Sequence, residues 1–200
     1  MYEATASLRE KRREKRRREI LQAALEVFGE KGYPKTTMDE IAERALLTRP
    51  ALYKYFSDKQ SILKGLTEWK LKELIAIFQE IVGGAGSFTE KLSLLVDEAV
   101  RFQKQNRGVF RAVMTANSLP SLARDENFRE LEKELEGVIT RLIKEGIDAA
   151  EVRNLPPAEL AGLLLTLLFN PAVTDFMAEE GRDPYDGELM KELFLRGVSR

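Results

Sequence analysis

The stretch LLTRPALYKYFSDK, residues 46–59, combines basic and phenolic side chains at short spacing. Five of its side chains could bind an anion: Arg49, Tyr53, Lys54, Tyr55 and Lys59. Guanidinium and ammonium groups form charge-assisted hydrogen bonds with phosphate oxygens, and phenol hydroxyls can donate to the same oxygens. The stretch is therefore more typical of a helix that lies against a polyanion than of an ordinary amphipathic helix with aromatic residues in the core.

Other chemistry is restricted by composition, because the 200-residue chain contains no histidine and no cysteine. This excludes disulfides, zinc sites built on those residues and any histidine-based triad. Catalysis by carboxylates alone remains possible in principle. However, we find no cluster of carboxylates, and GGAG at residues 83–86 lacks the Lys-Ser/Thr of a phosphate loop. The sequence predicts a protein that is not an enzyme and that needs no cofactor or metal.

The net charge of −1 hides an asymmetry along the chain. Residues 1–56 hold 13 Lys and Arg against 9 Asp and Glu, whereas residues 57–200 hold 19 against 24. Much of the positive excess lies in REKRREKRRR, residues 9–18, which has eight basic residues and two acids. A basic end on an acidic body favours a polyanionic partner at that end. A solvated, partly frayed helix start is the alternative interpretation of this run.

The elements that position these side chains read as helices nearly throughout, and the alternation typical of strands is absent. We predict an all-α fold of about nine helices, with NSLPSLARD (117–125) as a loop and Asn170-Pro171 as a break. Capping boxes begin helices at Thr37, Ser57 and Ser87. The predicted helices cover about 12–31, 37–45, 49–56, 57–82, 87–106, 109–116, 126–147 and 157–169, with a last amphipathic helix around 189–195.

Two of these helices, 37–45 and 49–56, are joined by the three-residue turn 46–48. A helix–turn–helix of this size presents its second helix at the width of a DNA major groove. Its outward side chains are predicted to be Thr48, Arg49, Pro50, Ala51, Tyr53, Lys54 and Tyr55. Arg49 suits guanine O6 and N7, and the small apolar Pro50 and Ala51 suit a thymine methyl group.

In ILQAALEVFGEKGY, TTMDEIAERA, LYKYF and DKQSIL, residues 18–65 resemble the DNA-binding region of the TetR family of bacterial transcriptional regulators. The resemblance implies contacts of Thr37, Thr48, Tyr53, Tyr55 and Lys59 with phosphates, and of Arg49, Pro50 and Ala51 with the groove floor. It also implies a divergent helical domain for ligand binding and dimerisation. The chain departs from the family at Leu46, where glycine is usual; a left-handed backbone there would be strained for leucine, so the turn is expected to differ slightly.

We therefore expect a DNA-binding domain over residues 1–57 and a ligand-binding and dimerisation domain over residues 58–200. The predicted helix at 157–169 is apolar on every side, which favours a homodimer through the last two helices. A hydrophobic or amphipathic effector is expected, such as a lipid-like or aromatic molecule or an acyl thioester. Ten residues are candidates for its site: Phe78, Phe102, Phe110, Met114, Asn117, Leu135, Ile139, Thr166, Phe169 and Asn170.

The function expected from these features is a cytoplasmic repressor that a small ligand releases from a palindromic, double-stranded operator. The basic run 9–18 could then follow the DNA backbone or the adjacent minor groove. No apolar run is long enough to span a membrane, so no membrane partner is expected. An architectural DNA-binding protein without a ligand is the alternative, although the large second domain argues against it.

Overall fold

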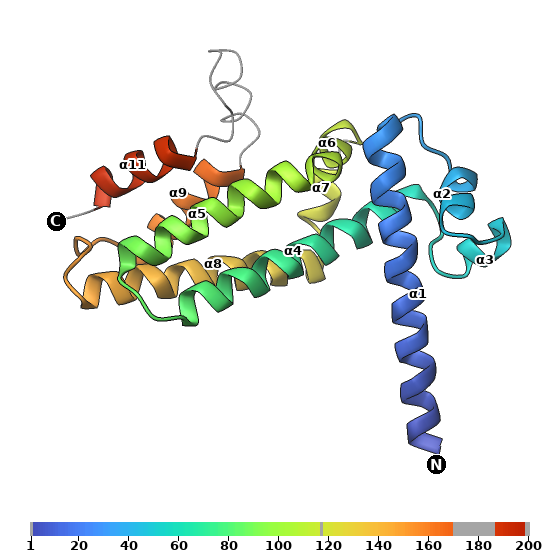
Figure 1. Cartoon of the computed structure of the whole chain (residues 1–200), viewed down its shortest axis with the longest axis horizontal. Helices are drawn as coiled ribbons and strands as arrows, with labels where there is room; N and C mark the ends of the chain where they lie inside the picture. The colour runs from blue at the N-terminus through green and yellow to red at the C-terminus, as the bar shows by residue number, and fades with distance from the viewer. Residues whose placement is uncertain (1, 117, 170–186, 199–200) are drawn as a thin grey trace. The chain divides into compact units, whose positions relative to one another are not determined.

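The computed structural model describes residues 2–116, 118–169 and 187–198, without the side chains of residues 2–7 and Leu119. The described residues form ten helices and no strand, which confirms the predicted all-α fold (Figure 1). The helices are α1 (Tyr2–Lys31), α2 (Met38–Arg44), α3 (Arg49–Tyr53), α4 (Lys59–Gly83), α5 (Phe88–Gln105), α6 (Arg107–Thr115), α7 (Leu119–Leu122), α8 (Glu126–Asp148), α9 (Pro157–Phe169) and α11 (Gly187–Val198).

Several predicted boundaries differ from the structure. The capping box predicted at Ser57 lies one residue later, because Asp58 N–H donates to the Ser61 hydroxyl and Ser61 N–H donates to the Asp58 carboxylate, so that α4 begins at Lys59. The first helix begins near Tyr2 rather than Arg12, so the whole basic run lies on this continuous helix. The segment predicted as the loop 117–125 contains the single helical turn α7. Ser118 begins this turn, because its carbonyl accepts hydrogen bonds from Ser121 and from the N–H of Leu122. The predicted break at Asn170-Pro171 lies outside the described residues.

The contacts divide the chain into two compact units. Unit 1 consists of residues 1–70 and 106–125, and unit 2 of residues 71–105 and 126–200. The prediction divided the chain at a single point, between residues 57 and 58. The contacts also group α6 and α7, which come later in the chain, with the helix–turn–helix. Helix α4 contributes its first turns to unit 1 and the remainder, from Leu71, to unit 2.

Unit 1 is built on α1, which packs against both α2 and α6. Its core includes the fully buried Ile20, Ile41 and Leu52. Helix α6 approaches α1 very closely, because a Cβ atom on Gly108 would lie 3.3 Å from the Cα of Gly29. Two glycines thus allow the backbones of α1 and α6 to meet.

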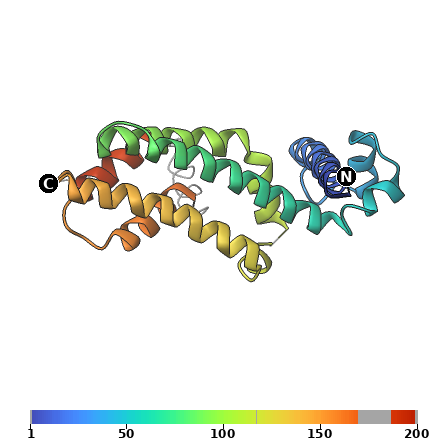
Figure 2. The same cartoon turned by 90° about the horizontal axis from the view of Figure 1, so that it is seen from below.

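Unit 2 is a helical layer in which α8 packs against α5 and α9, and α11 packs against α5 and α9. Helices α5 and α8 run along the length of this unit in both views (Figures 1 and 2). Phe78, Ile139 and Leu142 are fully buried in its core. None of the helices within the described ranges combines the length and the apolar character that a membrane crossing requires.

Two helices end in left-handed residues that are not glycine. Leu46, which follows α2, has a φ of 53°, and Ala150, which follows α8, has a φ of 60°. At α2, Leu47 N–H donates to the carbonyl of Ala42 and Leu46 N–H to that of Glu43. This pair of bonds is a Schellman motif, which needs a left-handed residue at its centre. The turn therefore keeps the left-handed conformation despite its leucine, contrary to the expected difference.

Candidate DNA-binding surface

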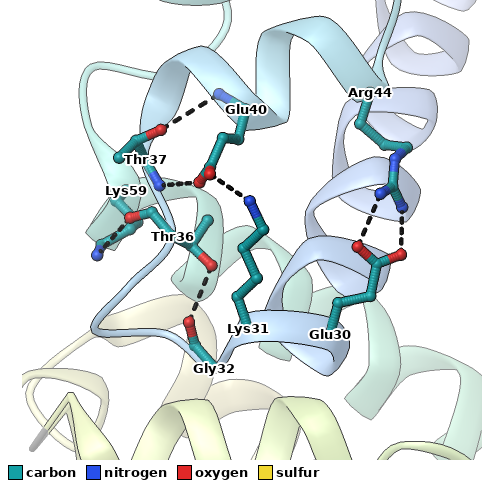
Figure 3. Close-up of polar contacts among 8 residues, drawn as sticks. All are labelled: Glu30, Lys31, Gly32, Thr36, Thr37, Glu40, Arg44 and Lys59. Atoms are coloured by element: carbon teal, nitrogen blue, oxygen red, sulfur yellow. Dashed lines mark hydrogen bonds and ion pairs between the residues drawn. The ribbon is translucent and has the colours of Figure 1, made fainter.

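The first helix of the helix–turn–helix begins at a capping box. Thr37 is the N-cap of α2: its hydroxyl accepts from Glu40 N–H, and its own N–H donates to the Glu40 carboxylate at 3.0 Å (Figure 3). The Lys31 ammonium also donates to this carboxylate, at 2.5 Å. Lys31 first, and then the Thr37 N–H, lower the pKa of Glu40 to about 2. The capping box predicted at Thr37 is confirmed, and it joins α2 to the end of α1.

The second helix, α3, is short and begins where the sequence predicted. Thr48 is its N-cap residue, and Pro50 lies in its first turn, where the missing N–H costs little. The Thr48 side chain makes no capping hydrogen bond, and the residue is exposed. Helix α3 ends at Tyr53, three residues before the predicted end, while Leu52 and Phe56 are buried as predicted.

The nine residues predicted to bind DNA differ in exposure. Six are exposed: Thr37, Thr48, Arg49, Pro50, Tyr53 and Lys54. Three are partly buried: Ala51, Tyr55 and Lys59. Thr48, helix α3 and Lys54 therefore carry an exposed surface with two cations, two hydroxyl groups and a proline ring. This surface has the hydrogen-bond donors that phosphates and base edges accept.

Arg49 is held by two neighbours on this surface. Its Nη1 donates to the Asp39 carboxylate at 3.1 Å, and its Cζ lies 5.7 Å from the centroid of the Tyr53 ring. A hydrogen bond with Tyr53, followed by the charge of Asp39, raises the pKa of Arg49. Asp39 was not predicted as a site residue, because its role depends on a contact between two different helices.

Lys59 occupies a different environment from the one expected of a phosphate ligand. Its ammonium donates to the carbonyl of Tyr33 at 2.7 Å. It also donates to the carbonyl of Thr36 at 2.8 Å (Figure 3). It also lies 4.4 Å from the centroid of the Tyr33 ring. Burial lowers the pKa of Lys59, although the charge of Glu40 opposes this. The donors of Lys59 are thus directed at the loop before α2, and its contact with a phosphate stays a prediction.

One residue of the basic run contacts the segment that follows α3. Arg17 lies 4.2 Å from the centroid of the Phe56 ring and donates to the carbonyl of Tyr55 at 3.3 Å. Gly65 on α4 leaves room for it, because a Cβ there would lie 3.2 Å from Arg17 Nη2. Sequence reasoning counted Arg17 only as a surface cation. Arg17 in fact connects α1 to the segment that follows α3.

A second ionic contact holds α2 in place. Arg44, in the last turn of α2, donates to Glu30 of α1 at 2.8 and 2.9 Å (Figure 3). It also donates to Glu26 of α1 at 3.1 Å. Such bidentate pairing fixes orientation as well as distance. Together with Lys31 and Glu40, Arg44 therefore sets the direction of the helix that carries Asp39.

The candidate effector residues are distributed over both units. Phe110 and Met114 lie on α6 in unit 1, whereas Asn117 and Asn170 lie outside the described residues. In unit 2, four of them are buried: Phe78, Phe102, Leu135 and Ile139. Phe169 is half-buried and Thr166 is exposed. The Thr166 hydroxyl donates to the carbonyl of Gly162 in its own helix.

A groove of about 680 Å³ lies between α4 and α5 in unit 2. Phe102 lines it, together with the apolar Ile77, Ile81 and Leu94 and the charged Glu80, Glu98 and Arg101. Leu94 is 55% exposed, although it lies on a helix whose apolar stripe is otherwise buried. In the sequence, the signal for this groove is Leu94, an apolar residue that lies outside the apolar stripe of its helix. Within the described part of the chain, no group of three acidic side chains could hold a metal ion.

Comparison with known proteins places this arrangement in a family. Residues 20–66 match the model of bacterial regulatory proteins of the tetR family, and residues 85–172 match a Tetracyclin repressor-like C-terminal domain. The fatty acid metabolism regulator protein of Bacillus subtilis is 24% identical over 186 residues, which cover 90% of this chain and 94% of that protein.

Two solved structures share the fold. A transcriptional regulator of the TetR/AcrR family from Thermobifida fusca aligns with a TM-score of 0.72 and 29% identity, covering 93% of this chain and 100% of that chain. The regulator FadR from Bacillus subtilis, solved in complex with stearoyl-CoA, aligns with a TM-score of 0.70 and 22% identity, covering 90% and 98%. With the helix–turn–helix and the second helical unit, these matches show that the chain belongs to the TetR family of DNA-binding transcriptional regulators.

Proposed function

We propose that the protein is a repressor that binds a palindromic operator as a homodimer and is released by a small amphipathic ligand. The observation that supports this most strongly is the exposed surface at the start of α3, where Thr48, Arg49 and Pro50 lie together. Arg49 reads base edges, while Thr48 and Tyr53 bind phosphates. The cytoplasm, where the operator would lie, is the proposed location.

The proposed dimer forms through α9 and α11. Leu160, Ala161 and Leu164 bury one side of α9, whereas Leu163 on another side is 59% exposed. Leu193 on α11 is 56% exposed. Two copies of these helices would make an intersubunit four-helix bundle that covers both leucines.

The proposed effector is a long-chain acyl thioester that binds in unit 2. The groove between α4 and α5 has the volume of a ligand site and combines an apolar wall with charged residues at its edge. One relative regulates fatty acid metabolism, and one structural neighbour was solved with stearoyl-CoA. A hydrocarbon chain against Phe102 and Ile81, with its polar head toward Arg101, would suit this lining.

The test begins with selection of bound sequences from random duplexes by the purified protein. We expect an inverted repeat, because a two-fold dimer presents two copies of α3. The affinity for the selected duplex is then measured with and without stearoyl-CoA, using octanoyl-CoA and free coenzyme A as controls. Recovery of no repeat would refute the dimeric operator reader. A repeat whose affinity does not respond to stearoyl-CoA would refute the effector alone.

A further inference from the structure

Asp39 is a carboxylate on the face proposed to meet DNA. It lies in the first turn of α2 and is as exposed as Arg49, with relative side-chain exposures of 60% and 61%. An acidic residue in the first turn of a helix is favourable to the helix dipole. Near a polyphosphate backbone, however, the same charge opposes binding. On a surface that meets DNA, the charge of Asp39 would therefore oppose binding.

The contact between Asp39 and Arg49 suggests that role. The two residues come from different helices and meet at 3.1 Å, and the guanidinium carbon lies 5.7 Å from the centroid of the Tyr53 ring. An exposed ion pair adds little to stability. It does restrict where the guanidinium can go, and a guanidinium has five N–H donors, of which this bond uses one. The remaining donors can still make a bidentate pair with guanine O6 and N7.

We propose that Asp39 is a specificity-determining residue, which positions Arg49 for base readout and opposes its use as a phosphate ligand. This inference rests on the proposed reading of DNA by α3. In the free protein, Asp39 holds the guanidinium at the start of α3. On the operator, Arg49 keeps its hydrogen bond with Asp39 and also forms hydrogen bonds with a base. On other sequences, Arg49 reaches a phosphate only by leaving Asp39, whose charge then faces the backbone alone.

The proposal predicts opposite effects on the two kinds of DNA. Asp39→Asn removes the charge and weakens the hold on Arg49 while keeping the size of the side chain. Affinity for random duplex should rise, and the preference for the selected operator over random duplex should fall on the order of tenfold, the range of one bidentate base contact. The base position that Arg49 reads should lose its preference, while the other positions keep theirs.

A double-mutant cycle separates this role from a simple effect of charge. Glu43→Gln is the matched control, because it removes one charge from another exposed residue of α2. It should raise affinity for all duplexes alike and leave the preference unchanged. In an Arg49→Ala background, Asp39→Asn should likewise no longer change the preference, because Arg49 is the group through which Asp39 acts. Thermal unfolding of each variant shows whether α2 remains folded.

The outcomes distinguish this proposal from the function on which it rests. If the unmodified protein selects no sequence, the proposed reading of DNA fails. If it does select an operator but Asp39→Asn leaves the preference unchanged, the role of Asp39 is refuted while the reading of DNA stands. A loss of preference that persists at full size in the Arg49→Ala background would also refute it, because Asp39 would then act without Arg49.

Discussion

At the scale of single residues, Leu46 has a strained, left-handed backbone, and its side chain does not stabilise the fold. The side chain is 88% exposed, so its removal loses almost no packing. A left-handed backbone costs a non-glycine residue about 1–2 kcal/mol. Glycine avoids this cost, but its larger loss of conformational entropy on folding cancels part of the gain. Leu46→Gly should therefore raise the free energy of unfolding by about 1 kcal/mol, as measured by urea denaturation.

A matched variant tests the cause of this gain. Leu46→Ala removes the same exposed side chain but keeps a Cβ atom, so it should give little of the increase. An equal gain from both variants would show that the exposed leucine itself, and not its backbone, is unfavourable.

Lys59 supports the loop before α2 from inside unit 1, and this role can be separated from a contact with DNA. Lys59→Met keeps the aliphatic stem but leaves the carbonyls of Tyr33 and Thr36 without their donor. We expect a loss of about 1 kcal/mol in the free energy of unfolding and no change in the salt dependence of DNA binding. A slope of log affinity against log salt that becomes shallower by about 0.9 would instead support the phosphate contact predicted from sequence.

At the scale of elements, the start of α2 depends on pH through Glu40. The folded-state pKa of about 2 lies below the ordinary value of 4.5, so the carboxylate stabilises the fold above pH 4.5. That stabilisation is lost as the pH falls from 4.5 toward 2. Glu40→Gln should accordingly be less stable than the unmodified protein at pH 7, and the difference should shrink at pH 4 and pH 3. Urea midpoints measured over this range check it, and a difference independent of pH would contradict it.

Helix α1 carries the basic run beyond the core of unit 1, where residues 8–15 are exposed. If cations of this helix bind phosphates, deletion of residues 1–16 should make the slope of log affinity against log salt shallower by about 0.9 for each lost contact. Deletion of residues 1–8 is the control, because it shortens the same helix but leaves the basic run in place. Equal slopes for all three proteins would show that the run is only solvated surface.

The sequence predicted many of the elements whose signals are local, although the capping box before α4 lies at Asp58 and not at Ser57. Neighbours within a few positions determine three of these features: the capping box of Thr37 and Glu40, the first turn of α3 with its Pro50, and the burial of Leu52 and Phe56. By contrast, the positions of Asp39, Arg17 and Lys59 depend on partners at least ten residues away. A periodic pattern shows which face of a helix is buried, but it does not show which polar groups meet across two helices.

At the scale of the whole molecule, ligand and DNA should affect each other equally. If an acyl thioester weakens operator binding, the operator must weaken binding of the thioester by the same factor, ordinarily about 5–150-fold. We expect fluorescence titrations of a labelled acyl-CoA with and without operator to give this factor. Identical thioester affinities in both titrations would mean that the two sites are independent, and the sensor role of unit 2 would have to be abandoned.

The division of the chain into units has a consequence for its synthesis. Unit 1 consists of residues 1–70 and 106–125, so its last piece is made only after the first part of unit 2. At about 5–20 residues per second, α6 follows residue 70 by roughly 2–7 seconds. During that interval α6, the helix whose Gly108 packs against α1, has not yet been synthesised. The surface proposed to read DNA thus belongs to a unit that can be completed only when residues 106–125 have been synthesised.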